Sequence, residues 1–578
     1  MPANERRLPL RNGEPRKLPR GCKRLASVTT SRHAEVTVVV RSRGGDDAWR
    51  KLYEELTAGL PGQRRYLTRA ELGKQWGAAP ADLAAVRKFG AAHGLKTVSS
   101  DAFRRCVVLS GPIDRIGRAF SVEFVAVQHP LGTFRSHRRR PLLPESIHSV
   151  VECVLGLDDL PSAETHLTIL HRDRVPRMDR KALLAAYRVP SRLHGKGECV
   201  AVIELGGGLH KRDFRRYFEK LRLPAPRLRV RQVGGAKNDP ADPADIRKVW
   251  AAMENGHFSP CKPFTFSGNP AVDAQAEWTI ETTMDLQIAG TVAPQASLLL
   301  IQAPGNDQGQ YHAITAAIAD GRNAPSVLSC SWGSNERTQT PALMLALDRW
   351  FQAAAVLGMT VCFSSGDRGD GTMCDPPGKK TFCIEFPACS PHVLAVGGTT
   401  LEPKAGTETA WKQDIAGLPM SGGGGFSSIF ALPPWQQKAT IDPAQWLPAG
   451  ASSGDGRAIP DVAAKADYDT AFSVIVGGTE VCTGGTSASV PFWGGLIAVL
   501  NQGLKGRAGS INPLLYDGTL DAGIRDITKG DTGFFHAEKG WDPCTGWGSP
   551  DGEALLRALR GQPKPRRASA PARSPRRR

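Results

Sequence analysis

The sequence predicts an α/β protein of two folded units, the larger built on a mostly parallel sheet covered by helices on both faces. From about residue 182 onward, near-continuous apolar runs alternate with long helical patterns. This alternation is typical of a parallel sheet that is buried on both sides. The chain of 578 residues also exceeds what one hydrophobic core usually organises, so a second unit is expected.

The first unit is a small mixed α/β domain over residues 34–160. Thr68 and Glu71 have the T-x-x-E spacing of a capping box, which indicates that a helix begins there. Strand-like runs occupy 35–40, 106–111 and 122–129, and helical patterns occupy 47–60 and the segment after Pro80.

The segments outside the two units are short. Residues 161–181 are rich in charge and lack periodicity, which indicates a linker. We expect residues 1–33 and the tail 563–578 to be disordered, because both are basic and poor in apolar residues. The N-terminus lacks the apolar run of a signal peptide, and no stretch of about 18 apolar residues suits a membrane span.

The charge balance is a weaker indicator of function. A net charge of +18 is compatible with nucleic-acid binding, since lysine and arginine displace counterions from a phosphate backbone. Much of the excess lies in three runs, 6–24, 135–140 and 563–578, and such runs are usually solvated. We therefore expect no specific nucleic-acid partner.

The second unit spans residues 182–562. Its strand-like runs lie at 198–205, 297–304, 325–332, 359–367 and 392–399, and its longest helical patterns at 271–290 and 340–358. In open parallel sheets, sites form beyond the carboxyl ends of the strands. Polar residues that end these runs are therefore the first candidates for chemistry.

Ser487 is the candidate nucleophile. It lies in the segment G-T-S-A-S, just before a long apolar helical pattern. Its hydroxyl would stand beside unpaired N–H groups at the start of a helix. A run of small residues is by itself more often a simple helix cap, so the interpretation depends on a base nearby.

Histidine is the usual base for a serine nucleophile. None of the 13 histidines stands in the H-G-T context of a subtilisin-type site. His194 lies in a charged loop, His312 opens a helix and His392 follows a proline. We expect each of the three to be an ordinary surface or core residue.

A pair of carboxylates offers another base. Glu281 and Asp285 are four residues apart in a helical pattern, so they share one helix face. Two adjacent carboxyls cannot both ionise cheaply, so such a pair holds a proton in mildly acidic solution. Spacing alone favours a solvated acidic face, to which Glu277 one turn earlier could equally belong.

Asp367 ends the run 359–367 and enters a glycine-rich loop. A carboxyl that burial and acid keep protonated could donate a hydrogen bond to a developing oxyanion. The simpler interpretation is an aspartate that closes a turn.

Together these motifs resemble those of the sedolisin family, the serine-carboxyl peptidases, and most of all its kumamolisin-like branch. G-T-S-A-S, E-x-x-x-D on a helix and S-G-D after a strand occur here in the family's order. The resemblance implies a serine-type endopeptidase with a subtilisin-like catalytic domain, preceded by a ferredoxin-like propeptide domain. It also implies four roles: Glu281 as general base, Asp285 as its supporting carboxyl, Asp367 in the oxyanion hole and Ser487 as nucleophile.

Two further segments extend the resemblance, which covers about 34–560. Glu204 in I-E-L-G-G-G and Trp332 in S-W-G match residues that extend the proton network behind the base in the kumamolisin-like branch. The front unit is similar to the family's propeptide.

Glu385, in the segment IEFPACSP, matches an acidic residue that faces the substrate pocket in the family. A carboxylate there would favour arginine or lysine beside the scissile bond. A solvated loop glutamate is the equal alternative. Three linker arginines would suit such a pocket, namely Arg174, Arg177 and Arg180.

The resemblance also implies one calcium ion near the C-terminus, where RDITKGD and GWDPCTGWGSPDG are similar to the family's metal loop. Calcium takes six or more oxygen ligands. The implied ligands are the side chains of Asp526 and Asp542 and the carbonyls of Ile527, Glu538 and Gly540. Glu538 stands where the family has glycine, an exchange that a carbonyl ligand tolerates.

The resulting hypothesis is an acid-active endopeptidase made as a self-processing zymogen. Carboxyl pKa values suggest an optimum of roughly pH 3 to 5. We expect protein or peptide substrates, a propeptide that is cut off within 160–190, an extracellular or extracytoplasmic location, and a monomer. Two alternatives stay open: an inactive peptide-binding relative, and a subtilisin-type hydrolase that depends on histidine.

Overall fold

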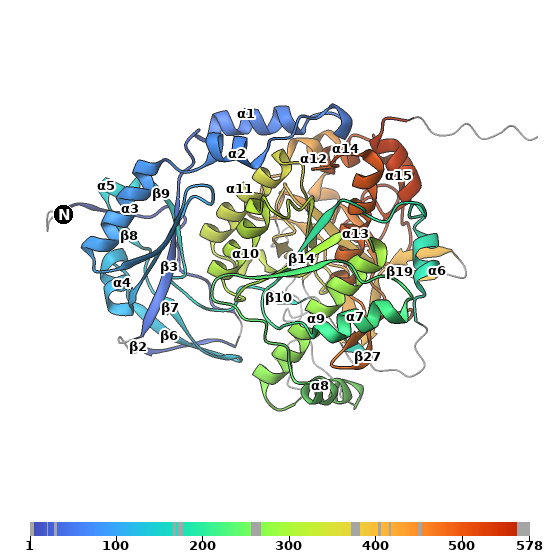
Figure 1. The fold of residues 1–578 in the computed structure, drawn as a ribbon, viewed down its shortest axis with the longest axis horizontal. Coiled ribbons are helices and arrows are strands. Elements are labelled where there is room, and N and C mark those ends of the chain that lie inside the picture. Colours follow the sequence, from blue (N-terminus) through green and yellow to red (C-terminus); the bar gives the residue numbers. More distant parts are fainter. Residues whose placement is uncertain are drawn as a thin grey trace, which may run out of the picture.

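The computed structural model shows two units side by side, the N-terminal one in blue (Figure 1). It describes residues 5–19, 21–27, 32–165, 169–170, 177–255, 267–371, 382–402, 406–415, 418–448 and 454–562. Within these residues, no helix is long and apolar enough to cross a membrane.

The N-terminal unit is built on an antiparallel sheet of four strands in the order β4-β5-β3-β9. Its strands are β3 (His33–Val40), β4 (Lys96–Asp101), β5 (Cys106–Pro112) and β9 (Val151–Leu155). Its main helices are α1 (Asp46–Thr57), α2 (Arg69–Trp76), α3 (Pro80–Ala92) and α4 (Ile113–Phe120). Of these four strands, β3 comes first in the chain and lies between the third, β5, and the fourth, β9, which confirms the predicted ferredoxin-like order.

The prediction that residues 1–33 are disordered is wrong for those that the structure describes. β1 (Arg7–Pro9) pairs with β8 (Leu142–Pro144), and β2 (Lys23–Ser27) pairs with β6 (Phe124–His129). Arg16 is only 2% exposed. The segment is ordered because its strands pair with strands of the folded domain, although it has no core of its own. Composition alone does not reveal such pairing. The basic tail 563–578 lies outside the described residues.

The second unit has an eight-stranded sheet. Seven of its strands follow the order β13-β14-β12-β15-β17-β19-β20, and the eighth, β25, pairs with β19. The strands are β12 (Cys199–Glu204), β13 (Leu228–Gln232), β14 (Ser297–Gln302), β15 (Val327–Cys330), β17 (Thr360–Ser364), β19 (Leu394–Glu402), β20 (Thr407–Ala410) and β25 (Val462–Lys465). All their pairings are parallel except that of β19 with β20. The predicted parallel sheet is confirmed.

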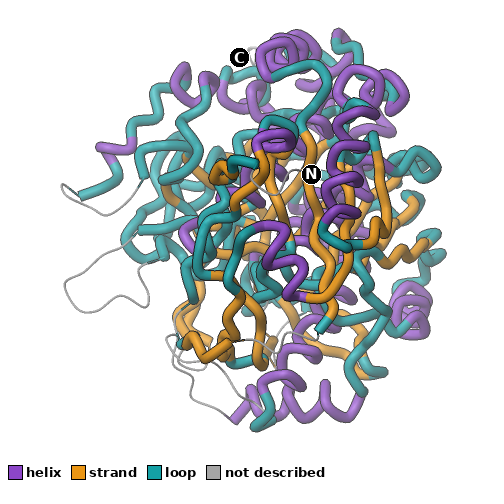
Figure 2. The backbone as a smooth tube through the Cα atoms, turned by 90° about the vertical axis from the view of Figure 1, so that its left-hand side faces the viewer, coloured by secondary structure: helices purple, strands orange, loops and turns teal. Residues whose placement is uncertain are grey.

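Helices cover both faces of this sheet, which lies behind the N-terminal unit in the view of Figure 2. Val200 and Val202 of β12 pack into one core with α9 (Pro270–Val292) and α13 (Thr486–Leu504). The alternate residues Ala201 and Ile203 pack into another with α10 (Asp307–Ala319) and α11 (Pro341–Val356). Since side chains alternate along a strand, a continuous apolar run is what a sheet covered on both sides requires.

Smaller elements complete the two units. The remaining helices are α5 (Glu145–His148), α6 (Arg180–Ala186), α7 (Lys211–Lys220), α8 (Pro243–Asn255), α12 (Pro434–Lys438), α14 (Asn512–Tyr516) and α15 (Gly552–Leu559), with 3₁₀ turns at Pro61–Gln63, Glu336–Thr338, Pro443–Gln445 and Asp521–Gly523. The remaining strands are β7 (Gly132–His137), β10 (Glu164–Thr165), β11 (Ile169–Leu170), β16 (Trp332–Asn335), β18 (Glu385–Phe386), β21 (Lys412–Ile415), β22 (Leu418–Ser421), β23 (Gly425–Phe426), β24 (Ala458–Ile459), β26 (Phe472–Val476), β27 (Thr479–Thr483), β28 (Ile524–Arg525) and β29 (Ser549–Pro550).

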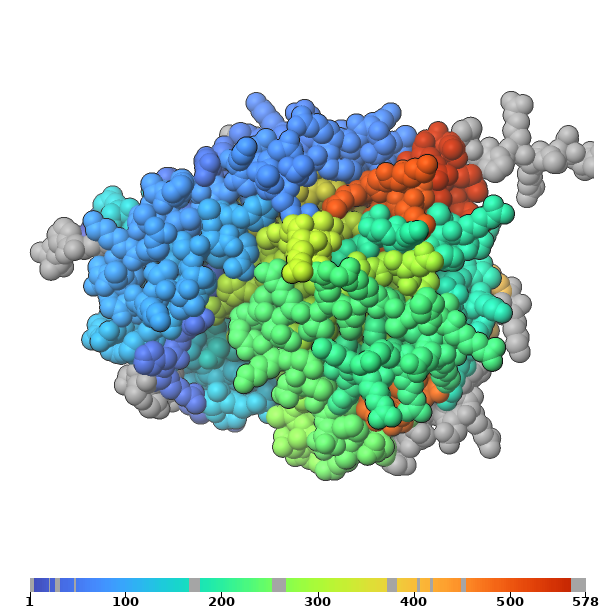
Figure 3. Space-filling model, viewed as in Figure 1, coloured from blue at the N-terminus to red at the C-terminus, as the bar shows by residue number. Residues whose placement is uncertain are grey.

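The N-terminal unit covers one end of the second unit (Figure 3). Trp76 of α2 lies edge-on to Trp350 of α11, with 4.5 Å between ring centroids, and stacks on Trp49 of α1 at 5.4 Å. The guanidinium of Arg105 lies 4.1 Å from the Trp76 ring. Aromatic packing of this kind joins the units through a buried contact.

The segment between the units is bound to the second unit where the structure describes it. β10 pairs antiparallel with β16, and β11 pairs antiparallel with β27. β16 also pairs on its other side with β18. The linker therefore adds strands to the second unit on either side of residues 166–168, which lie outside the described part.

Candidate active site

Ser487 lies in the first turn of α13, where the sequence predicts it. Gly485 precedes the helix with φ 83°, in the left-handed region that favours glycine. The serine is fully buried, and its Oγ makes no hydrogen bond of standard geometry with the described residues. A buried hydroxyl without a partner is available for chemistry.

Glu281 and Asp285 lie on α9, which packs against α13. Both side chains are fully buried, so the interpretation as a solvated acidic face is wrong for this pair. Ser331 Oγ lies 2.7 Å from Asp285 Oδ2 and 3.2 Å from the carbonyl oxygen of Ser487. This hydroxyl ties the acidic helix to the backbone of the candidate nucleophile.

The buried surroundings of Glu281 and its acidic neighbours strongly shift its pKa. Burial raises its pKa well above the ordinary range, and the charges of Asp285 and Glu204 raise it further. The Ser487 hydroxyl opposes these effects from close by, although neither oxygen of Glu281 makes a hydrogen bond of standard geometry. Glu281 and Ser487 are therefore close neighbours.

Glu204 extends this cluster from the end of β12. Its Oε2 accepts hydrogen bonds from Trp332 Nε1 at 2.9 Å and from Thr282 Oγ1 at 3.2 Å. Burial and then the charge of Asp285 raise the pKa of Glu204. Since the three carboxyls are buried together, they cannot all ionise, and the cluster retains protons.

Asp367 follows β17 and is 2% exposed. Its Oδ1 accepts hydrogen bonds from Thr486 N at 2.8 Å and from Thr486 Oγ1 at 2.6 Å. The strand-end carboxyl thus lies directly beside the start of the Ser487 helix.

Glu277, one turn before Glu281, is half-buried. Burial, followed by the charges of Asp273 and of Glu164 on β10, raises the pKa of Glu277 to about 8. The linker therefore runs beside the acidic helix at the edge of the site.

Glu385 starts β18 and is partly exposed. Its carboxyl packs so closely on Gly366 that a Cβ there would lie 2.8 Å from Glu385 Cδ. The side chain therefore lies near the loop of Asp367, on the strand that flanks β16 opposite the linker strand β10.

We predicted that the linker arginines suit a pocket carrying Glu385. For the two arginines that the structure describes, this prediction is wrong. Arg177 pairs with Glu480 at 2.7 Å, and Arg180 Nε donates to the carbonyl of Thr291 at 2.9 Å. These partners lie on β27 and α9. Arg174 lies outside the described residues.

Three supporting residues were missed by the sequence analysis: Ser331, Thr282 and Thr486. Each is the immediate neighbour of a residue that motif matching had already selected. Their hydroxyls are identified only by where the folded chain aims them.

The candidate histidines are engaged elsewhere. His312 Nε2 lies 2.9 Å from Thr37 Oγ1, and His392 Nδ1 lies 2.9 Å from the Tyr53 hydroxyl. Both partners belong to the N-terminal unit, so these imidazoles lie at the contact between units and not beside Ser487.

The residues implied as calcium ligands gather in one loop region. Gly540 N donates to Asp526 Oδ2 at 2.9 Å, and Glu538 N donates to Asp542 Oδ2 at 3.0 Å. Ile527 is buried and Asp526 exposed. No group of three or more His, Cys, Asp or Glu side chains suited to a metal occurs in the described ranges, so any site here depends on carbonyl oxygens as well.

Asp542 supplies the test of fit. It is fully buried, and it accepts hydrogen bonds from N–H and O–H donors of Glu538, Cys544 and Thr545. Among the described residues, no lysine or arginine forms an ion pair with it. A buried carboxylate without a cationic side chain fits a bound cation.

Comparison with known proteins agrees with this geometry. Residues 20–160 match the family described as Pro-kumamolisin, activation domain, and residues 271–515 match the subtilase family. Kumamolisin from Bacillus sp. (strain MN-32) is 36% identical over 554 residues, which cover 92% of each chain. Tripeptidyl-peptidase 1 from Homo sapiens is 32% identical over 302 residues, 48% of this chain and 52% of that protein.

Among solved structures, Pseudomonas sedolisin, a serine-carboxyl proteinase complexed with two molecules of pseudo-iodotyrostatin, matches with a TM-score of 0.54 and 25% identity. The match covers 67% of this chain and 99% of that one. The activation domain and the subtilisin-like peptidase unit thus occur in one chain, as in a self-processing zymogen. The protein belongs to the sedolisin family of serine-carboxyl peptidases and is a serine-type peptidase similar in organisation to pro-kumamolisin.

Proposed function

We propose that this peptidase cuts proteins in acid through Ser487 as nucleophile, Glu281 as general base, Asp285 as its supporting carboxyl and Asp367 as oxyanion donor. One observation carries the proposal: the Ser487 hydroxyl lies unpaired among fully buried carboxyls, with Glu281 as its neighbour. Such an arrangement replaces the imidazole of other serine peptidases with a carboxylate.

The reaction is acyl transfer. Glu281 takes the Ser487 proton as the oxygen attacks the peptide carbonyl, and a protonated Asp367 donates a hydrogen bond to the oxyanion. Glu281 then returns the proton to the departing amine, and water hydrolyses the acyl-enzyme. Glu204 and Trp332 support the network behind the base. Because the network needs partly protonated carboxyls, we expect an optimum of roughly pH 3 to 5.

The decisive test replaces Ser487 and Glu281 separately with alanine. Both variants should lose casein cleavage and self-processing, while Glu219→Ala, an exposed glutamate on α7, should behave like the parent. A neutral or alkaline optimum that survives Glu281→Ala would favour the histidine-dependent alternative. Peptide binding without cleavage by the parent would favour the inactive relative.

The domain organisation in this proposal follows the sequence: an activation domain at 34–160, a linker with the processing site at 161–181 and the peptidase at 182–562. Support comes from β10, which pairs with β16 beside the candidate site as a substrate strand would. N-terminal sequencing after acid exposure should give a start within 160–190.

Glu385 is proposed to favour arginine or lysine near the scissile bond. Its support is the close packing on Gly366, next to Asp367. For two peptides that differ only in a basic or a neutral residue near the scissile bond, the parent should cleave the basic peptide with the higher kcat/KM. This preference should be smaller in Glu385→Gln. Equal discrimination by both would return Glu385 to a structural role.

One calcium ion is proposed at the loop of Asp526 and Asp542, with carbonyls of Ile527, Glu538 and Gly540. Bound there, the ion would hold this loop against the core. Chelation should lower the thermal midpoint of the full chain, and Asp542→Asn should remove the response to chelator. We also propose an extracellular or extracytoplasmic location and a monomer, which cell fractionation and size-exclusion chromatography would test.

A further inference from the structure

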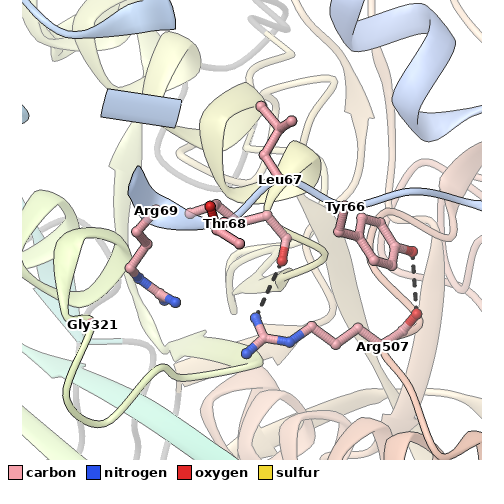
Figure 4. Close-up of a pocket in the computed structure, with 7 residues that line it drawn as sticks. Tyr66, Leu67, Thr68, Arg69, Gly321 and Arg507 are labelled. Atoms are coloured by element: carbon pink, nitrogen blue, oxygen red, sulfur yellow. Dashed lines mark hydrogen bonds between the residues drawn. The ribbon is translucent and has the colours of Figure 1, made fainter. Parts of the chain in front are cut away.

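A pocket of about 350 Å³ lies at the contact between the activation domain and the peptidase. One wall is the activation-domain segment 66–69, and the other includes Gly321, Leu357 and Arg507 of the peptidase. Figure 4 shows the guanidinium groups of Arg69 and Arg507 turned toward each other across it. The pocket therefore exists only while the activation domain is docked.

The segment 66–69 is held firmly on the peptidase. Leu67 N donates to the carbonyl of Val356 at 2.8 Å, and the Tyr66 hydroxyl lies 3.2 Å from the carbonyl of Arg507. The Tyr66 side chain packs directly on Gly358 and Gly509, where a Cβ would lie 2.7 Å from its ring and 2.6 Å from its hydroxyl, respectively. Arg69 is thus brought to Arg507 by fixed backbone contacts.

The hydrogen bonds of the two arginines leave a buried donor of Arg69 unsatisfied. Arg507 donates to the carbonyls of Leu357 at 3.2 Å and Ala324 at 2.9 Å, and Arg69 Nε donates to Ile318 O at 2.8 Å. Arg69 Nη2, in contrast, is buried and without a partner among the described residues. A buried donor left unpaired costs free energy, so a ligand that accepts its hydrogen bond is favoured.

The charge of the pair is only partly compensated. Neither guanidinium forms an ion pair with a carboxylate in the described part of the chain. Asp320, the acidic neighbour of Arg69, is committed to Asn323 at 2.8 Å and to Arg231 at 3.4 Å. Burial and then the charge of Arg507 lower the pKa of Arg69 to about 10. Burial likewise lowers the pKa of Arg507, which the charge of its acidic neighbour Glu198 opposes.

We propose that this pocket binds a tetrahedral oxyanion, sulfate or phosphate, between Arg69 and Arg507, and that the bound anion holds the activation domain on the peptidase. Guanidinium groups match such anions through paired N–H donors. The anion would satisfy Arg69 Nη2 and offset the repulsion between the two cations. Because it binds only the docked form, it stabilises the zymogen by mass action and slows conversion.

The test uses the full-length Ser487→Ala chain, whose intact mass is checked first, because a cut chain would count against the proposed nucleophile and not against the pocket. Calorimetric titration with sodium sulfate, with sodium chloride at equal ionic strength as reference, should show one saturable site. Phosphate should compete for it. The affinities measured for sulfate and for phosphate show which of the two anions the pocket prefers.

Arg69→Gln should weaken sulfate binding at least tenfold. Arg65→Gln, which removes an exposed arginine four residues away, should leave it unchanged. Sulfate should also slow the acid conversion of the parent severalfold and have no such effect on Arg69→Gln. The proposal is overturned if Arg69→Gln binds sulfate like the parent, if chloride gives the same response, or if the processed peptidase alone binds equally well. Arg69→Lys keeps the positive charge but lacks the paired N–H donors of the guanidinium. Its sulfate affinity should lie between those of the parent and Arg69→Gln, and such binding shows that the fold is retained.

Discussion

Asp367 accepts two hydrogen bonds from Thr486, at 2.8 Å from the backbone nitrogen and 2.6 Å from Oγ1. The two residues are 119 positions apart in the chain, and Thr486 immediately precedes Ser487. A carboxyl at the end of a strand is therefore fixed to the first turn of the helix that carries the nucleophile. This contact gives the proposed oxyanion donor its position.

Replacing Asp367 with alanine should lower kcat by about 10²- to 10³-fold, the usual effect of losing one oxyanion donor. Asp367→Asn should retain more activity, because the amide can still donate a hydrogen bond and still accept from Thr486. Steady-state kinetics on one peptide would measure both variants, with thermal midpoints to exclude unfolding. Near-parent kcat in Asp367→Ala would remove this residue from the oxyanion site.

Replacing Glu204 with glutamine should move the acid limb of the kcat/KM profile to lower pH. The charge of Glu204 raises the pKa of Glu281, after burial and Asp285. Without that charge, the base ionises at a lower pH and works further into the acid range. The profile of free enzyme against pH measures the shift. A limb that stays in place or moves upward would mean that the two carboxyls are not coupled.

The half-buried Glu277 should make the folded chain less stable as the pH rises. Its pKa is about 8 when folded and about 4.3 when unfolded, so the folded state holds the proton more tightly. Its contribution is therefore complete below about pH 4 and is lost as the pH rises toward 8. Thermal midpoints of the Ser487→Ala chain at pH 4 to 8 should fall more steeply than those of the same chain with Glu277→Gln. Glu219→Gln, an exposed control, should follow the parent; identical slopes in all three would contradict the assignment.

Replacing Arg16 with alanine should release the activation domain. The Arg16 side chain lies buried between Asp158 of the activation domain, at 3.4 Å, and Asp307 of the peptidase. Removing the cation leaves two buried carboxylates unpaired, which costs about 3–5 kcal/mol for such a site. Acid conversion should become faster and the zymogen's thermal midpoint lower. Arg11→Ala, which removes an exposed arginine of the same segment, is the control, and equal conversion by the two variants would show that Arg16 does not hold the units together.

Local patterns in the chain were enough to predict much of this protein. Alternation and helical periodicity predicted the two-sided parallel sheet, and the capping box at Thr68 predicted the start of α2, because both depend on residues a few positions apart. Motif order also selected Glu281, Asp285, Asp367 and Ser487. Each such signal survives without knowledge of the fold.

Long-range contacts decided the rest. Spacing alone favoured a solvated face for Glu281 and Asp285, yet α13 covers them, since burial depends on which helix packs on α9. The strand pairing of Arg7–Pro9, the true partners of Arg177 and Arg180, and the supporting hydroxyl of Ser331 likewise depend on segments more than 40 positions away. A side chain's charge state and partner are properties of its surroundings, and those surroundings exist only once the chain has folded.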